Sequence, residues 1–243
     1  MTKRGVVTTL LVFFLVFALS GCSTFKGWFG KKNKPDRPPE ELAQEGLKNL
    51  KKKKYDDAIE TFEQVRDRYP YSEQALLAQI KVADAYFFKK KYEEALQAYR
   101  EFEKLHHTNK AVPYCIFREG QCYYRQRSTI DRDQTYTQKA IEEFTRLKQK
   151  FPNSEFIPRA DKYLAQCRKD LADKEFYIAE FYYRTKRYQA ALDRYQALSQ
   201  DYADFANSAQ VKQRIEECQT LIAKKDQPKG ILSNVTSIFD AKW

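Results

Sequence analysis

Glycine and proline are scarce in this sequence, with seven and eight residues in a chain of 243. A protein built of short strands needs such residues at frequent turns, so their scarcity argues against an all-β fold. The only two histidines, His106 and His107, are adjacent and therefore cannot share one helix face as zinc ligands do. The G-x-S-x-G, Walker, H-E-x-x-H and dinucleotide-binding motifs are also missing. We therefore expect no enzymatic activity, no cofactor and no metal, and a function that lies in surfaces.

The N-terminus carries the features of a secretory signal. A basic segment, residues 1–4, precedes an apolar run at residues 5–19, which is shorter than the about 20 residues that cross a bilayer. The tetrapeptide LSGC follows and resembles a bacterial lipobox, which predicts a cleaved signal peptide of residues 1–21 and acyl chains on Cys22. An ordinary signal peptide with a chance cysteine, or an uncleaved anchor, is the alternative. Gram-negative lipoproteins kept at the inner membrane usually carry aspartate after the cysteine, so Ser23 favours the outer membrane.

The net charge of +11 falls to +9 when the signal, with its two basic residues, is removed. A basic chain can bind nucleic acid, anionic lipid or an acidic partner. Most lysines here stand in short runs beside acidic residues, as in Lys51–Lys54 and Lys89–Lys91, and no RNA-binding signature accompanies them. We interpret these runs mainly as solvated helix ends and expect no nucleic-acid partner.

Four cysteines remain after Cys22, and their spacing is scattered. Export to an oxidising space permits disulfides, but this spacing matches neither a paired metal motif nor a dense disulfide framework. Cys115 and Cys122 are seven residues apart, hence on one helix face but about 10 Å apart along the axis, too far to bond each other. We interpret these two, with Cys167 and Cys218, as buried small apolar residues; a disulfide is the alternative.

A repeat of 37 residues runs through the first half of the chain. Gly46, Ala83 and Gly120 are each 37 apart, and the segments Tyr55–Ile59 and Tyr92–Leu96 have the same separation. A small residue in a first helix lets a second helix approach closely, an alanine on the second helix accepts that approach, and an aromatic residue four positions later fills the gap. This pattern resembles the tetratricopeptide repeat of 34 residues.

Two later units depart from the period. In the third, twenty residues instead of twelve separate Gly120 from the next small residue, which predicts an inserted loop at residues 126–136. The loop contains Asp131 and Asp133, which could bind a metal or, as we expect, pair within the loop. In the fourth, the first small residue comes fourteen positions late, nearly four helical turns, which predicts one long helix over 158–184.

A single amphipathic helix at residues 207–225 is predicted to cap the last pair, as a solenoid requires. The tail that follows, residues 231–243, has amphipathic spacing up to Phe239 and either folds back, serves as a docking peptide or stays disordered. The tether, residues 23–39, mixes aromatic residues with lysines and either lies at the membrane interface or is a plain linker.

We therefore predict an all-α, tetratricopeptide-like solenoid of about four to five helix-turn-helix repeats with a C-terminal capping helix. The predicted regions are the signal peptide (1–21), the lipid-anchored tether (22–39), the N-terminal repeats (40–125), the C-terminal half with the insertion, long helix and cap (126–225), and the tail (226–243).

Several longer motifs stand in a specific order along this architecture. They are Pro35–Pro39, Asp67–Pro70, Phe151–Ser154 and Leu171–Tyr183. With the lipobox, the repeats and the insertion, they resemble the BamD family, the essential lipoproteins of the β-barrel assembly machine. The resemblance covers nearly the whole chain after the signal, but the tail departs from the best-known members, which puts partners bound through the extreme C-terminus in doubt.

The resemblance implies a periplasm-facing scaffold on the inner leaflet of the outer membrane. Such a protein holds the periplasmic POTRA domains of the barrel subunit BamA through its C-terminal repeats, works beside other lipoproteins of the machine, and offers an N-terminal groove to unfolded outer-membrane barrel proteins. Arg194 matches the position that the family uses towards BamA. A pilotin for secretin assembly should lack the insertion and the long helix, and a lytic transglycosylase would need a catalytic domain for which no residues remain.

The register of the repeats assigns one strip of the first helices to the concave side of the solenoid. The residues expected there are Ala43, Leu47, Leu50, Leu77, Ile80, Asp84, Phe87, Tyr114, Phe117, Gln121 and Tyr124. This strip is more apolar and aromatic than a solvated face, which suggests a site for an extended peptide with apolar or aromatic side chains. The alternative is that these side chains pack on the tether or on the next repeat.

Overall fold

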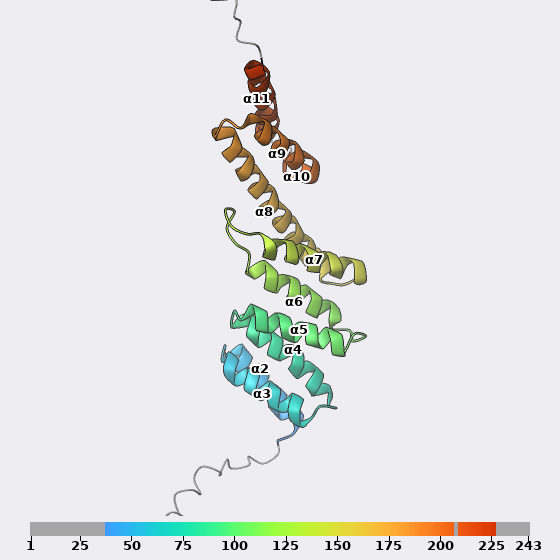
Figure 1. Ribbon diagram of the computed structural model, residues 1–243. Coiled ribbons are helices and arrows are strands. Elements are labelled where there is room, and N and C mark those ends of the chain that lie inside the picture. The colour runs from blue at the N-terminus through green and yellow to red at the C-terminus, as the bar shows by residue number, and fades with distance from the viewer. Residues whose placement is uncertain (1–36, 207–208, 227–243) are drawn as a thin grey trace, which may run out of the picture.

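The computed structural model describes residues 37–206 and 209–226, all of whose regular elements are helices. The signal peptide, Cys22, most of the tether and the tail lie outside the described residues. Figure 1 shows an elongated stack of helical hairpins. The elements are α2 (Pro39–Lys51), α3 (Tyr55–Arg68), α4 (Glu73–Phe88), α5 (Tyr92–Leu105), α6 (Val112–Arg125), α7 (Thr135–Lys150), α8 (Ile157–Arg184), α9 (Tyr188–Asp201), α10 (Ala203–Ala206) and α11 (Ala209–Asp226).

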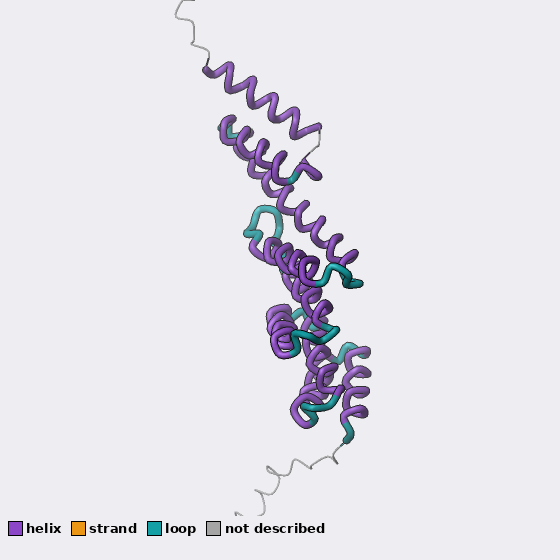
Figure 2. Tube along the Cα trace, turned by 90° about the vertical axis from the view of Figure 1, so that its right-hand side faces the viewer, coloured by secondary structure: helices purple, strands orange, loops and turns teal. Residues whose placement is uncertain are grey.

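The helices pair in sequence order, so that α2 to α9 form four hairpins, each stacked on the next (Figures 1 and 2). The turns within the hairpins lie along one edge of the stack, and the connections between hairpins lie along the opposite edge (Figure 1). This arrangement is the predicted all-α helical-repeat solenoid, and the fold class is confirmed.

Small residues allow the two helices of a hairpin to touch. A Cβ atom added at Gly46 in α2 would come within 2.7 Å of the Phe62 ring of α3, and one added at Gly120 in α6 within 2.6 Å of the Phe144 ring of α7. Both phenylalanines are completely buried. The small and aromatic positions of the repeat therefore fit together as the sequence pattern predicts.

Three of the hairpin turns share one backbone conformation. Lys53, Lys90 and Lys186 have φ of 60°, 64° and 60°, in the left-handed region. In each turn, the amide of the next residue donates to the carbonyl five positions back, as in Lys54 N to Asn49 O at 2.9 Å. This is the bonding of a helix that ends at a left-handed residue, a place usually taken by glycine. Here a lysine occupies it each time.

The third hairpin has the inserted loop instead. The side-chain amide of Gln134 donates to the backbone carbonyl oxygens of Thr129 and Arg132. The side chain of Asp133 accepts a hydrogen bond from the backbone amide of Thr135 at 3.1 Å. Asp131 accepts from the Thr129 hydroxyl at 2.6 Å. The loop thus forms its own hydrogen bonds, and both of its aspartates take part in them.

The long fourth-unit helix is present as α8, which has 28 residues and begins one residue before the predicted start. Its first half buries Ala160 and Cys167 in the core of the second and third hairpins. Its second half buries Ala172 and Ala179 in a separate core with α9 and α11. One helix therefore serves two cores.

A capping helix covers the last hairpin. It is α11, which buries Val211 and Cys218 in the core shared with α9. The structure describes it from Ala209, and residues 207–208 are not described. The short helix α10 between α9 and α11 was not predicted from the sequence.

Candidate functional site

The eleven residues assigned to the concave strip lie on α2, α4 and α6, but they differ widely in exposure. Leu47 and Leu77 are exposed, at 38% and 36%. Leu50, Tyr114 and Tyr124 are half-buried. The buried members are Ala43, Ile80, Asp84, Phe87, Phe117 and Gln121. The strip is therefore not one open apolar surface, and only five of its residues can be reached by a peptide.

Phe117 shows what covers the buried members. Its ring stacks on Phe156 with centroids 5.3 Å apart and contacts Phe144 and Tyr163 at 5.9 Å and 6.0 Å. These partners belong to the rest of the third repeat and to the start of the fourth. The ring of Phe117 thus packs against the helices that follow it, which is the arrangement that the sequence left open as an alternative to an exposed groove.

Asp84 is the centre of a buried polar cluster between the second and third hairpins. Its Oδ1 accepts hydrogen bonds from the hydroxyls of Tyr99 and Tyr114, both at 2.6 Å, and its Oδ2 accepts one from Lys81 at 2.6 Å. Arg118 donates to the Tyr99 hydroxyl at 3.0 Å. Burial, and next the negative charge of Asp84, raise the pKa of Tyr99 and of Tyr114. The two phenols therefore stay protonated and donate to the carboxylate.

Arg118 joins this cluster to the aromatic core. Its guanidinium carbon lies 3.6 Å from the centre of the Phe87 ring, and its Nη1 donates to Gln121 at 2.8 Å. Gln121 in turn donates to the hydroxyl of Tyr163 on α8 at 3.0 Å. Asp84 and Gln121 are thus members of a hydrogen-bonded chain that runs from α4 to α8.

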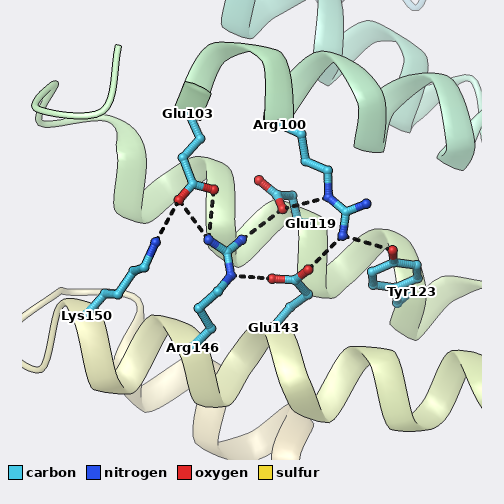
Figure 3. Close-up of polar contacts among 7 residues, drawn as sticks. All are labelled: Arg100, Glu103, Glu119, Tyr123, Glu143, Arg146 and Lys150. Carbon is cyan, nitrogen blue, oxygen red and sulfur yellow. Dashed lines mark hydrogen bonds and ion pairs between the residues drawn. The ribbon is translucent and has the colours of Figure 1, made fainter. Parts of the chain in front are cut away.

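A second charged cluster joins α5, α6 and α7 (Figure 3). Arg146 of α7 donates to Glu103 of α5 at 2.7 Å, to Glu119 of α6 at 2.9 Å and to Glu143 of its own helix at 2.7 Å. Arg100 of α5 donates to Glu143 at 2.9 Å. Two guanidinium groups therefore tie three helices together through shared carboxylates.

Glu119 is the most enclosed member of this charge cluster. Its side chain is fully buried, and its Oε1 has no hydrogen-bond partner among the described residues. Burial, and next the neighbouring carboxylate of Glu143, raise the pKa of Glu119 to about 8, although Arg146 opposes the shift. A carboxyl group that is kept neutral in this way does not need a full countercharge.

Arg118 and Glu119 were not predicted from the sequence to be buried residues of structural importance. Charged residues in the middle of a helix usually face water. The structure shows that ten of the fourteen residues of α6 are buried, on every side of the helix, and this enclosure is not visible in the sequence of α6. A helix buried all round must pair its charges inside the protein.

Arg194, the residue assigned to partner docking, lies on α9 with a half-exposed side chain. Its Nη1 donates to Glu175 of α8 at 2.8 Å. The ion pair therefore sits on the surface of the last hairpin, where solvent reaches the arginine.

The four cysteines of the described residues are buried and free. Burial raises the pKa of Cys122 to about 12 and that of Cys167 to about 11. The interpretation of all four as buried small apolar residues is confirmed, because each is buried and none forms a disulfide among the described residues. Among residues 37–206 and 209–226 no group of histidine, cysteine or acidic side chains could hold a metal ion, and no helix is long and apolar enough to cross a membrane.

A family model of outer membrane lipoproteins, named YfiO, matches residues 35–229. The chain belongs to this family. Three of its relatives among known proteins are called outer membrane protein assembly factor BamD. The one of Rickettsia prowazekii is 29% identical and covers 100% of this chain and 95% of its own length. The protein of Caulobacter vibrioides is 24% identical, and the match covers 91% of this chain and 72% of the relative. The protein of Neisseria meningitidis serogroup B is 26% identical, and the match covers 90% of this chain and 85% of the relative.

The resemblance to the BamD family seen in the sequence is thereby confirmed. Similar solved structures include the TPR2AB domain of yeast Sti1 in a complex with pHSP90. It has a TM-score of 0.46 and 15% identity, and the match covers 76% of this chain and 70% of that chain. The first TPR domain of human RPAP3 has a TM-score of 0.43 and 23% identity, and the match covers 56% of this chain and 94% of that domain.

Proposed function

We propose that this chain is a non-catalytic scaffold of β-barrel assembly, anchored to the outer membrane and facing the periplasm. The observation that carries the proposal is the match of residues 35–229 to the outer membrane lipoprotein family. It is supported by relatives that are named outer membrane protein assembly factors, of which the one in Rickettsia prowazekii aligns over 95% of its own length.

The anchor in this proposal is a set of acyl chains on Cys22. Each methylene buried in the bilayer contributes about 0.8 kcal/mol, so the two or three chains of a lipoprotein anchor it stably, whereas a single chain binds only marginally. Replacing Cys22 by Ala is expected to release the chain from membranes. A mature protein whose N-terminus is unmodified and is not Cys22 would contradict the anchor.

The C-terminal half is proposed to bind the POTRA domains of BamA, with Arg194 as a contact. The half-exposed ion pair of Arg194 with Glu175 supports this role. A surface ion pair contributes at most about 1 kcal/mol to stability, so the arginine can exchange its intramolecular carboxylate for one on a partner at little cost.

The N-terminal repeats are proposed to bind unfolded outer-membrane barrel proteins on the accessible part of the first-helix face. Leu47 and Leu77 are exposed there, and Leu50, Tyr114 and Tyr124 are partly so. Extended segments with alternating apolar side chains fit isolated apolar positions of this kind. The buried residues beneath hold α2, α4 and α6 in place.

Purification of the tagged, full-length protein from detergent-solubilised membranes, followed by mass spectrometry, tests the proposal. We expect a BamA-type barrel subunit, with other lipoproteins of the assembly machine, to copurify. Recovery of a secretin instead would make the chain a pilotin, which is the second candidate function. Recovery of peptidoglycan fragments, or of neither protein, would contradict a role in barrel assembly.

A further inference from the structure

The hairpin turns bring most of the basic runs to one edge of the solenoid. Figure 1 shows the four turns along the same edge, away from the connections between hairpins. We call the exposed residues of these turns the turn edge. Its basic members are Lys51, Lys52, Lys53, Lys54, Lys90, Lys91, Arg125, Arg132, Arg184, Lys186 and Arg187.

The acidic residues beside the turns neutralise only part of this charge. Lys54 pairs with Asp57 at 3.5 Å and Lys91 with Glu94 at 3.0 Å. No ion pair with any described residue is formed by Lys51, Lys52, Lys53, Lys90, Lys186 or Arg187. The last hairpin turn also has no acidic residue in the first turn of α9. A surplus of positive charge therefore remains at three separate turns of one edge.

The backbone of the turns gives an independent reason to assign a role to these lysines. Lys53, Lys90 and Lys186 occupy the left-handed conformation, which glycine adopts without strain and which costs other residues about 1–2 kcal/mol. A lysine with this unfavourable backbone conformation recurs at three equivalent turns of the chain. It places an unpaired ammonium group at the tip of each turn, where glycine would place none.

Apolar side chains accompany the charges. Phe88, next to Lys89 and Lys90, is half exposed and stacks on Tyr55 with ring centroids 6.3 Å apart. Ile130 is exposed in the loop of the third hairpin. Lysines with neighbouring aromatic and aliphatic residues suit the boundary between lipid headgroups and acyl chains, where the ammonium groups meet phosphates and the rings enter the apolar layer.

We propose that the turn edge lies on an anionic phospholipid surface and orients the solenoid on the membrane. The proposal rests on the proposed acyl anchor at Cys22 for its setting. The residues from Cys22 to Pro38 can span up to roughly 50–55 Å when extended, whereas α2 is only about 20 Å long, so an anchored chain can bring this edge to the bilayer. Each lysine or arginine near an anionic bilayer adds to the attraction, within about one Debye length.

The test uses the full mature chain with Cys22→Ala, so that acyl chains play no part, in vesicle flotation. One set of vesicles contains phosphatidylcholine alone, and the other contains phosphatidylcholine and phosphatidylglycerol in equal molar parts. We expect flotation with the anionic vesicles only. The triple variant Lys53→Gln, Lys90→Gln and Lys186→Gln is expected to bind them roughly 100-fold more weakly, about fivefold for each charge removed.

The matched control removes three exposed lysines near the opposite edge, by Lys104→Gln, Lys110→Gln and Lys162→Gln. It has the same net charge as the triple variant and should keep most of the binding. Equal binding of the two variants, equal flotation with neutral vesicles, or no flotation at all would overturn the proposal. A turn edge that binds an acidic protein instead of lipid would give the last of these results. Acylation of Cys22, measured separately on the wild-type protein, distinguishes failure of the turn edge from failure of the anchor.

Discussion

Arg146 donates a hydrogen bond to Glu119 at 2.9 Å, and this guanidinium reaches the only oxygen of Glu119 that has a partner among the described residues. The other oxygen is buried against protein. An acid in such surroundings holds its proton to higher pH than the same acid in the unfolded chain, because burial penalises the charged form.

The first prediction concerns the pH dependence of stability. Burial raises the pKa of Glu119 from 4.5 to about 8 in the folded state, so the folded chain binds more protons than the unfolded chain between these values. The contribution of Glu119 to the free energy of unfolding is therefore fully present below pH 4.5 and is lost as pH rises towards 8. In urea titrations, Glu119→Gln should remove this part of the pH dependence. Parallel curves for wild type and variant across this window would show that Glu119 ionises normally.

The second prediction concerns the small positions. Gly46→Leu or Ala95→Leu forces a large side chain between paired helices and should lower the free energy of unfolding by about 1–3 kcal/mol or more. Ala165→Leu on the exposed side of α8 is the matched control and should change stability little. Unchanged melting temperatures for both core variants would refute the assigned register.

The third prediction concerns the left-handed lysines. Lys53→Gly relieves an unfavourable φ and should raise the free energy of unfolding by roughly 0.5–1 kcal/mol. Lys51→Gly, in the helical last turn of α2, should lower it by a similar amount. Chemical denaturation of both variants checks the contrast, and a loss of stability in both would argue against strain at Lys53.

The fourth prediction concerns the first-helix face. Photo-crosslinkers at Leu47 and Leu77 should capture unfolded barrel proteins, because both side chains are exposed. A crosslinker at Phe117 should capture none, since that ring is enclosed by Phe144, Phe156 and Tyr163. Crosslinks from Leu47 and Leu77 that reach only residues 23–39 of the same chain would mean that its own N-terminal segment covers this face.

The fifth prediction separates binding from stability at Arg194. Arg194→Ala should change the free energy of unfolding by less than about 1 kcal/mol, because the pair with Glu175 is partly solvated. The same variant should lose copurification with BamA. Arg168→Ala, on α8 of the same hairpin and exposed, is the control and should keep it. Loss of binding in both variants would remove the special role of Arg194.

The fold could be predicted because its main determinants are local. Gly46 and Gly120 must be small for steric reasons, and together with Ala83, midway between them, they reveal the period of 37 residues. The length of α8 followed from the same period, because fourteen extra residues return a helix to nearly the same face.

The candidate surface was predicted less well because exposure depends on what lies across the interface between repeats. Helical register assigned Phe117 and Asp84 to one face of their helices, but it contains no information on how closely the neighbouring helices pack over that face; both side chains are buried. The burial of Arg118 and Glu119 could not be predicted for a related reason. Their partners come from helices distant in sequence, and the residue pattern of one helix does not show that other helices will enclose its charges.

The length of α8 has a geometric consequence for the two ends of the molecule. Cys167 belongs to the core of the preceding hairpins and Ala172 to that of the last one, with only a few helical residues between them. Each residue of an α-helix turns the chain by about 100° and advances it by about 1.5 Å. Deleting a single residue between these two would swing α9 and α11 by more than a quarter of a revolution about the α8 axis and carry Arg194 to a different side of the molecule. The angle about the α8 axis between the first three hairpins and the part of the molecule that carries Arg194 is thus set by the number of residues in α8.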